Sequence, residues 1–259
     1  RGAMHPTGTR SVPLVIPGGK TRTTTFSFLW KGGPLSFAIE VNGVAVPLTA
    51  ASGSMPAGSD TVLWGTAIST RATNVRTIRI SAPMGATIAG QTAKITVTNA
   101  NAAAIELHSY VNDLYSGWAQ GVYWSEDFSD RTTICSPSTA DTAIAVGSYR
   151  LDHPQAGQAK GDLATFSSQG PRLDRAHSID LVAPEDHIAS IRLNGPLGEL
   201  AIGSGTSNAA PVVAGIAALL KALDPSASPA NLRTRLRSKA SFETQMGSFP
   251  SDQWGTGRI

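Results

Sequence analysis

An apolar run behind a glycine-rich approach constrains the fold of this chain more than any other feature. Residues 203–215 read Gly-Ser-Gly-Thr-Ser-Asn-Ala-Ala-Pro-Val-Val-Ala-Gly, and Lys221 is the only charged residue in 207–223. The apolar side chains cover more than one helical face, which predicts a helix that is buried in a complete domain. Pro211 is expected in the first turn, where a missing N–H costs nothing.

Ser207 lies at the mouth of this predicted helix. Backbone N–H groups surround that position, and the positive end of the helix dipole lies behind it. Such surroundings suit a nucleophile whose reaction builds an oxyanion. The alternative is that Ser207 only caps the helix, because Ser and Thr are favoured caps.

The whole run resembles the nucleophile motif of subtilisin-like serine proteases, Gly-Thr-Ser-Met-Ala-Ala-Pro-His-Val-Ala-Gly. Asn208 replaces the usual Met and Val212 the usual His, and neither position is catalytic in that family. The resemblance implies that Ser207 is the catalytic nucleophile and that Thr206 supports the oxyanion. It places Gly205 and Asn208 beside the substrate.

Four other runs resemble motifs of the same family in the family's order, so that the resemblance covers residues 131–259. One contains Phe-Ser-Ser-Gln-Gly-Pro and another Leu-Val-Ala-Pro, which is followed by Glu185 where Gly is usual. The four runs lie at residues 136–148, 162–171, 179–190 and 254–259.

The family's other catalytic motifs do not occur in this sequence. The Asp-Thr-Gly turn, the His-Gly-Thr-His helix, the Ser-Leu-Gly-Gly pocket run and the oxyanion Ala-Gly-Asn are absent. The five histidines are His5, His108, His153, His177 and His187. None has the family context, and Asp152-His153 and Asp186-His187 are expected to be surface pairs.

We therefore expect a companion segment of the same protease to supply the catalytic Asp and His. Half of a doubly wound sheet cannot bury both faces of its central strands, and the helix after Ser207 would expose apolar surface. The 259 residues are expected to be held against that segment and to be inactive without it. The implied substrate is a protein or peptide.

The first half of the chain has the pattern of an all-β domain. Residues 35–41 alternate strictly between apolar and polar side chains and end at Asn42-Gly43, a hairpin turn signal. Further candidate strands lie at residues 23–30, 44–48, 61–64, 75–80, 93–98 and 105–111. This pattern predicts a β-sandwich, of jelly-roll type as in some bacterial members of the family.

The predicted fold class is thus α/β: the C-terminal part of a subtilisin-like doubly wound parallel-sheet domain, preceded by an all-β sandwich insert. We place the insert at residues 1–126 and the C-terminal half of the catalytic domain at residues 127–259. Residues 10–105 are expected to form a sandwich that folds on its own.

Four tryptophans allow two interpretations of what the sandwich does. They either line a groove for a glycan or peptide, or fill cores and domain seams, where most tryptophans lie. The four are Trp30, Trp64, Trp118 and Trp124.

The last predicted helix begins at Ser228 as its cap, with Pro229 in the first turn. Leu232 and Leu236 are expected to face inward. Its basic residues are predicted to form the solvated side of an amphipathic helix: Arg233, Arg235, Arg237 and Lys239.

Composition excludes several function classes. A net charge of +3 on 259 residues, without a basic cluster that includes aromatics, argues against nucleic-acid binding. No run of about 18 apolar residues is free of charge, which argues against a membrane span. The low charged fraction of 15% is typical of exported bacterial proteins and predicts a secreted or periplasmic location. Cys135 is the only cysteine and is expected to pack.

No metal site is evident in the sequence, and no cofactor is required by the expected reaction. Residues 112–130 are rich in carboxylates, and subtilisin-like enzymes often carry calcium. The carboxylate spacing matches no calcium loop, so we interpret these side chains as solvated loop acids and leave calcium open.

Three rival interpretations stay open. The first is a sedolisin-type acid serine peptidase, which also has its serine in a Ser-Gly-Thr-Ser run before a buried helix. The second is a pseudoprotease or binding module whose sandwich holds a glycan or peptide. The third is a scaffold fragment with neither activity nor ligand.

Overall fold

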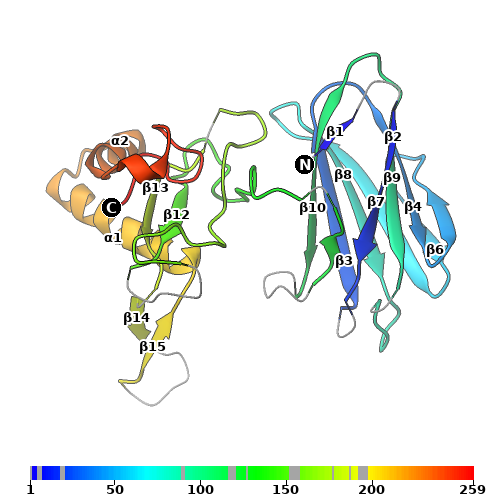
Figure 1. The fold of residues 1–259 in the computed structure, drawn as a ribbon, viewed down its shortest axis with the longest axis horizontal. Coiled ribbons are helices and arrows are strands. Elements are labelled where there is room, and N and C mark those ends of the chain that lie inside the picture. The colour runs from blue at the N-terminus through cyan, green and yellow to red at the C-terminus, as the bar shows by residue number, and fades with distance from the viewer. Residues whose placement is uncertain are drawn as a thin grey trace. The chain divides into compact units, whose positions relative to one another are not determined.

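The chain divides into two compact units, Arg1–Ser129 and Asp130–Ile259 (Figure 1). The computed structural model describes residues 2–4, 8–17, 21–88, 91–115, 121–126, 128–151, 158–176, 178–186, 188–191 and 198–259. The sequence placed the boundary between residues 126 and 127, and the identity of the two parts as insert and catalytic half stays a prediction.

The first unit consists of two antiparallel sheets (Figure 1). The first sheet has the order β1 (Gly2–Met4), β10 (Ile105–Asp113), β3 (Thr23–Trp30), β8 (Asn74–Ser81), β7 (Asp60–Ile68), β6 (Gly53–Ala57). The second has the order β11 (Tyr123–Trp124), β2 (Thr9–Val15), β9 (Ala93–Asn99), β4 (Leu35–Val41), β5 (Val44–Pro47).

Both sheets contribute to one hydrophobic core. Phe28 of β3 and Phe37 of β4 are buried, and their ring centroids lie 5.1 Å apart. Alternate residues of β3 and β9 are buried, because successive side chains of a strand point to opposite faces. The predicted all-β first half is present as two packed sheets, whereas the jelly-roll assignment stays a prediction.

The predicted hairpin at Asn42-Gly43 is confirmed. Strand β4 ends at Val41, β5 begins at Val44, and Val41 pairs with Val44. Asn42 has φ 50° and Gly43 φ 79°, the two positive values that a two-residue turn between twisted strands requires.

Four strands of the first unit were missed. Strands β1 and β11 are only 3 and 2 residues long, whereas β2 and β6 each contain a proline. Pro56 lies in β6, the last strand of its sheet, where a missing N–H leaves no interior hydrogen bond unmade. Pro13 lies in β2, whose outer neighbour β11 is only 2 residues long. Edge positions therefore accept these prolines, and the sequence pattern alone does not show which positions are edges.

The described tryptophans support the core interpretation. Trp30 is buried, and its indole Nε1 donates to the Gly33 carbonyl at 2.9 Å. Trp124 is half-buried, with its ring 5.6 Å from Phe26. Trp64 is half-buried against the same core. Trp118 lies outside the described residues.

We expect the first unit to fold by itself. Residues 1–129, expressed alone, should give a soluble protein with a β-type circular dichroism spectrum and a cooperative unfolding transition, because the unit has its own core. A mainly helical spectrum, or unfolding without cooperativity, would contradict this expectation.

The second unit is built around the parallel pair β12 (Val146–Tyr149) and β13 (Leu181–Pro184). Its other elements are β14 (Ile188–Ile191), β15 (Leu200–Gly203), α1 (Thr206–Leu223), α2 (Pro229–Lys239) and the short helix η2 (Thr244–Met246). Leu181 and Ala183 pack with α1 and α2, whereas Val182 packs with Met246 and Trp254. Strand β13 is therefore covered on both faces, as in an α/β domain.

Helix α2 begins as predicted. Ser228 caps it by accepting from the Asn231 N–H at 3.2 Å, Leu236 is fully buried and Leu232 is half-buried. The expectation that its basic residues are simply solvated is wrong for Arg233, whose Nε donates to the buried Asp180 carboxylate at 2.8 Å. This ion pair ties α2 to the start of β13.

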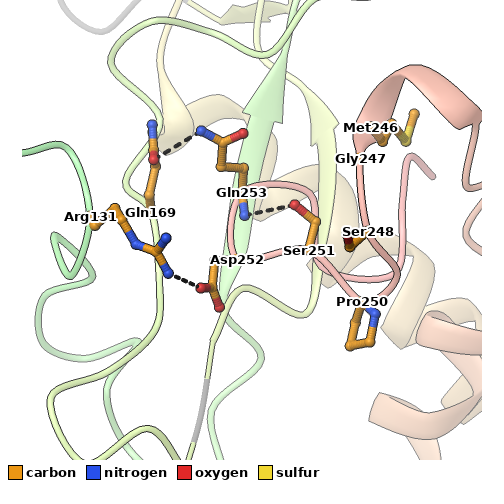
Figure 2. A pocket seen from close by; sticks show the side chains of 9 residues that line it. All are labelled: Arg131, Gln169, Met246, Gly247, Ser248, Pro250, Ser251, Asp252 and Gln253. Carbon is orange, nitrogen blue, oxygen red and sulfur yellow. Dashed lines mark hydrogen bonds and ion pairs between the residues drawn. The ribbon is translucent and has the colours of Figure 1, made fainter.

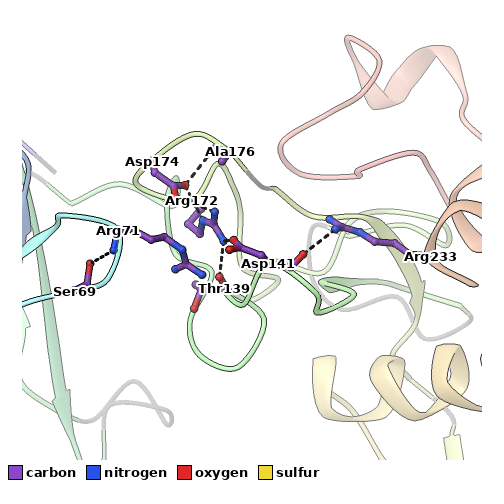
Figure 3. A network of polar contacts seen from close by, with 8 residues as sticks. All are labelled: Ser69, Arg71, Thr139, Asp141, Arg172, Asp174, Ala176 and Arg233. Carbon is purple, nitrogen blue, oxygen red and sulfur yellow. Dashed lines mark hydrogen bonds and ion pairs between the residues drawn. The ribbon is translucent and has the colours of Figure 1, made fainter. Parts of the chain in front are cut away.

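A second arginine holds the loop that carries the Phe-Ser-Ser-Gln-Gly-Pro motif. Arg172, directly after that motif, is buried and forms two hydrogen bonds with Asp174, at 2.7 and 2.8 Å (Figure 3). It also donates to Asp141 and to the Thr139 carbonyl, each at 2.6 Å. The hydrogen bond to Asp174 raises the pKa of Arg172 above its usual value.

Cys135 does not pack as expected. Its side chain is exposed. The neighbouring Ile134, which is half-buried, is the residue of this segment that packs against the second unit's core.

Candidate active site

Ser207 is the second residue of α1 and is exposed. The helix begins at Thr206, and its N-cap is Gly205, which has φ 140° and no side chain to form a cap hydrogen bond. Ser207 therefore does not act as the N-cap, and the capping interpretation is wrong. Its hydroxyl is accessible at the positive end of the helix.

Pro211 lies inside α1 and not in the first turn, so that expectation is wrong. A proline at this position cannot donate to the carbonyl four residues earlier, which is that of Ser207. The first hydrogen bonds of the helix converge instead on the Gly205 carbonyl, from the N–H of Asn208 at 2.8 Å and of Ala209 at 3.4 Å. The backbone around Ser207 is consequently not that of a regular helix interior.

Glu185 contacts the approach to Ser207. The carboxylate is fully buried, and its Oε2 accepts from the Ser204 hydroxyl and from the Gly205 N–H, the latter at 2.8 Å. The Glu185 backbone carbonyl accepts from Gly205 N–H and from Asn208 Nδ2, each at 3.2 Å. Thus the residue that stands where the family usually has Gly holds three residues around Ser207, namely Ser204, Gly205 and Asn208.

Arg150 is the charged partner of Glu185. Its Nη1 lies 3.3 Å from Glu185 Oε1, and the side chains are 2% and 0% exposed. The contact is within ion-pair distance but lacks the geometry of a hydrogen bond, since Oε1 accepts none. Nε of Arg150 donates to Gln158 Oε1 at 3.1 Å, which fixes the guanidinium from its other side.

Asp186 was expected to lie at the surface, and the structure shows that this is wrong. It is buried, and its Oδ1 accepts from the Leu151 N–H at 2.6 Å. Its expected partner His187 lies outside the described residues. The consecutive carboxylates of Glu185 and Asp186 therefore both connect the end of β13 to the end of β12.

The only histidine that the structure describes is His108. It lies on β10 of the first unit, is buried, and has Nε2 3.2 Å from Glu106. The other histidines, His5, His153, His177 and His187, lie outside the described residues. Within the described part of the second unit, therefore, no histidine accompanies Ser207.

The described residues contain no group of three or more His, Cys, Asp or Glu side chains arranged to hold a metal ion. Asp113, one of the carboxylates considered for calcium, accepts from the N–H groups of Tyr115 and Val122, each at 2.7 Å. Asp113 therefore has a structural role in its loop.

A surface pocket of about 450 Å³ lies in the second unit, lined by residues distant from Ser207 in the sequence (Figure 2). It is lined by Arg131, Gln169, Met246, Gly247, Ser248, Pro250, Ser251, Asp252 and Gln253. Hydrogen bonds between these residues shape it: Arg131 donates to Asp252 at 2.7 Å, and Gln253 to Gln169 at 3.0 Å. The pocket contains no residue of the predicted site.

Apolar surface is exposed on two elements next to Ser207. On α1 only Ala209 and Val213 are buried, whereas Leu219 is 68% and Leu223 83% exposed. The strand pair β14–β15, which directly precedes Ser204 in the chain, exposes Ile191, Leu200 and Ile202. Among helices in the described ranges, α1 alone is long and apolar enough to cross a membrane, a property that core helices of soluble proteins share.

The sequence model of the subtilase family matches residues 64–256, which is more than half of the chain. The chain belongs to the subtilase family. The match includes the Ser207 segment and all four of the runs that resemble family motifs except the last residues of the final one, so the resemblance found in the sequence is confirmed.

Curated subtilases resemble parts of this chain. The serine protease AprX of Bacillus subtilis is 34% identical over 119 residues, which are 42% of this chain and 27% of AprX. The subtilisin-like protease SBT3.5 of Arabidopsis thaliana is 46% identical over 79 residues, 29% of this chain and 10% of SBT3.5. The subtilase chain thus spans well under half the length of these relatives.

A solved structure shares the fold of the subtilase chain. The CspB protease of Clostridium perfringens superposes with a TM-score of 0.76 at 23% identity, over 100% of this chain and 53% of that one. At this identity the likeness shows the fold alone. Because all of this chain is covered, the likeness extends to the first unit as well as the second.

Proposed function

We propose that this subtilase chain is the nucleophile-bearing part of a serine endopeptidase that hydrolyses peptide bonds through an acyl-enzyme on Ser207. The observation that carries the proposal is the position of Ser207: exposed, in the first turn of α1, and inside the family match. A serine at that place combines an accessible hydroxyl with the positive end of a helix.

In the proposed reaction Ser207 Oγ attacks the carbonyl carbon of the scissile bond while a histidine from outside these 259 residues takes its proton. The same histidine returns that proton to the leaving amine, and a water molecule then releases the acyl group as a carboxylic acid. The Ser207 N–H is at the second position of α1, before the regular hydrogen bonds of the helix begin, so it is available to the oxyanion. Thr206 supports that donor, and neither metal nor cofactor takes part.

Gly205 and Asn208 flank the nucleophile and are proposed to lie beside the substrate. Asn208 Nδ2 donates to Glu185, and a Cβ added to Gly203 would lie 2.9 Å from that nitrogen. The Asn208 side chain therefore braces the segment from within. We propose that the hydrogen bond to Glu185 positions Asn208 next to the substrate.

A fluorophosphonate probe tests the proposed nucleophile in the full-length protein. The probe is expected to form a covalent bond with Ser207 Oγ, which peptide mass spectrometry after digestion would locate. Heat-unfolded protein is the control, because labelling by a catalytic serine requires the folded site. Labelling of other serines with none at Ser207 would contradict the proposal.

We further propose that a companion segment of the same protease supplies the catalytic Asp and His and covers α1. The exposed Leu219 and Leu223 support this, as does the β12–β13 sheet, which has only 2 strands in the described residues. A purely apolar helix face of this kind is unfavourable in water. The first unit would then be a jelly-roll-like insert, and the protease would act as a secreted or periplasmic enzyme.

The companion segment should be found with these residues in the purified protein. Size-exclusion chromatography with mass analysis is expected to show residues 1–259 together with further polypeptide, joined covalently or bound. A well-folded monomer of these 259 residues alone, with peptidase activity, would contradict this prediction.

A further inference from the structure

We infer that Glu185, with its charge balanced by Arg150, is a positioning residue that holds the nucleophile segment in its reactive arrangement. The inference rests on the proposed function of Ser207. It starts from a departure of this sequence from its family, because Glu185 stands where the family motif has Gly. A glycine has no side chain with which to contact Ser204 and Gly205.

The strand register brings the two charged residues together. Tyr149 pairs with Pro184 at the ends of the parallel strands β12 and β13, so the next residues along the two chains are Arg150 and Glu185. The Glu185 N–H donates to the Tyr149 carbonyl at 3.1 Å and continues the ladder by one step. The pair thus lies at the carboxyl end of the sheet, where α/β folds place their sites.

The Glu185 carboxylate holds Gly205, the N-cap residue of α1, from outside the helix. Its Oε2 accepts from two consecutive groups, the Ser204 hydroxyl and the Gly205 N–H. Gly205 has φ 140°, a left-handed conformation that favours glycine, so the bend before α1 depends on contacts from outside itself. Fixing this bend fixes the direction of the first turn, and with it the Oγ and N–H of Ser207.

Arg150 balances the negative charge of the Glu185 carboxylate, which would otherwise oppose the oxyanion. A negative charge near a helix N-terminus stabilises the helix. The same charge would oppose the oxyanion that forms at the Ser207 N–H, since like charges repel strongly in a buried environment. Arg150 Nη1 at 3.3 Å balances the charge while the hydrogen bonds from Ser204 and Gly205 remain. Removing Arg150 alone should therefore harm catalysis more than removing both charges.

The test measures kcat and KM of the full-length protein on a peptide substrate. A fluorophosphonate titrates the reactive Ser207, and kcat is expressed per titrated serine. For Glu185→Gln we expect kcat per titrated serine to fall roughly tenfold with KM changed little, because misplacing a reacting group slows the chemical step. Arg150→Met should lose more, and the double variant should recover part of that loss.

Arg233→Met is the matched control. It breaks another ion pair to a buried carboxylate, that of Asp180, which directly precedes β13 and so lies at the opposite end of the strand from Glu185. Its thermal stability should fall, while kcat per titrated serine should stay at the wild-type value. A purely structural role of Glu185 would give this same result for Glu185→Gln and would overturn the inference.

Two further outcomes keep the test decisive. If Glu185→Gln does not fold, Ser204→Ala takes its place: Ser204 is exposed, and the substitution removes only one donor to the carboxylate. An unchanged kcat for Ser204→Ala would then overturn the inference, and a fall of several-fold would support it. Labelling of the wild-type protein distinguishes failure of the proposed function from failure of the inference. Wild-type protein that hydrolyses peptides without labelling at Ser207 would overturn both. Labelling at Ser207 with unchanged kcat in the variants would overturn the inference alone.

Discussion

Substitution of Ser207 by alanine is expected to lower kcat of the full-length protein by several orders of magnitude and to leave the fold intact. The change removes the one atom that forms the acyl-enzyme, and the remaining groups of a serine protease site give only a small residual rate. Ser207 is exposed, so removing its hydroxyl leaves no buried group without a partner.

The measurement compares peptidase rates of the variant and the wild type at equal concentrations of folded protein, with circular dichroism to confirm the fold. Ser238→Ala is the control, because Ser238 is also an exposed serine on a helix, and its hydroxyl donates to the Arg235 carbonyl at 2.9 Å. It should retain full activity. Near-normal turnover by the Ser207→Ala variant would show that the nucleophile lies elsewhere.

Substitution of Gly257 by alanine is expected to destabilise the second unit by about 3 kcal/mol or more. Gly257 has φ 118°, and a Cβ built on it would lie 2.1 Å from the Ser241 carbonyl oxygen. The clash is with backbone, which cannot rotate away as a side chain can. Gly257 also accepts from the Val182 N–H at 2.9 Å, so any shift would pull on β13 in the middle of the core.

Gly247→Ala separates the cost of the unfavourable backbone conformation from the cost of the steric clash. Gly247 belongs to the same unit and has φ 84°, but nothing lies within 4 Å of its added Cβ. Its free energy of unfolding should therefore fall only by the cost of placing alanine at positive φ, about 1 to 2 kcal/mol. Urea unfolding of the three proteins would measure both changes. Equal losses for the two variants would mean that close packing at Gly257 contributes nothing.

Local patterns in the sequence were enough for most of the first unit. Residues 35–41 and 23–30 were expected as strands with the bounds that β4 and β3 have. The first segment alternates strictly between apolar and polar side chains, and the second is rich in residues that favour strands, both of which are properties of the chain itself. Strands β2 and β6 were missed because acceptance of their prolines depends on position within a sheet. That position follows from pairing between segments distant in sequence.

The sequence was also enough to propose Ser207 as the nucleophile, since its run is continuous and the family match includes it. The residue at which α1 begins was not evident from the sequence. The helix begins at Thr206, which places Pro211 in its interior, and the cap is a glycine without a side-chain hydrogen bond. A run of apolar residues shows that a helix forms, but the contacts at its first turn determine where it begins.

The sequence by itself determined the two-part organisation, the strands that alternate and the serine at the head of an apolar helix, because each is encoded in neighbouring residues. Only the tertiary structure decided what surrounds that serine. Glu185 looked like an exception to a motif, and Asp186 like a surface residue. The parallel register of β12 and β13 buries both, sets Arg150 against Glu185 and turns the Glu185 carboxylate toward Ser204 and Gly205. Side chains far apart in the chain acquire these partners only when the strands pair.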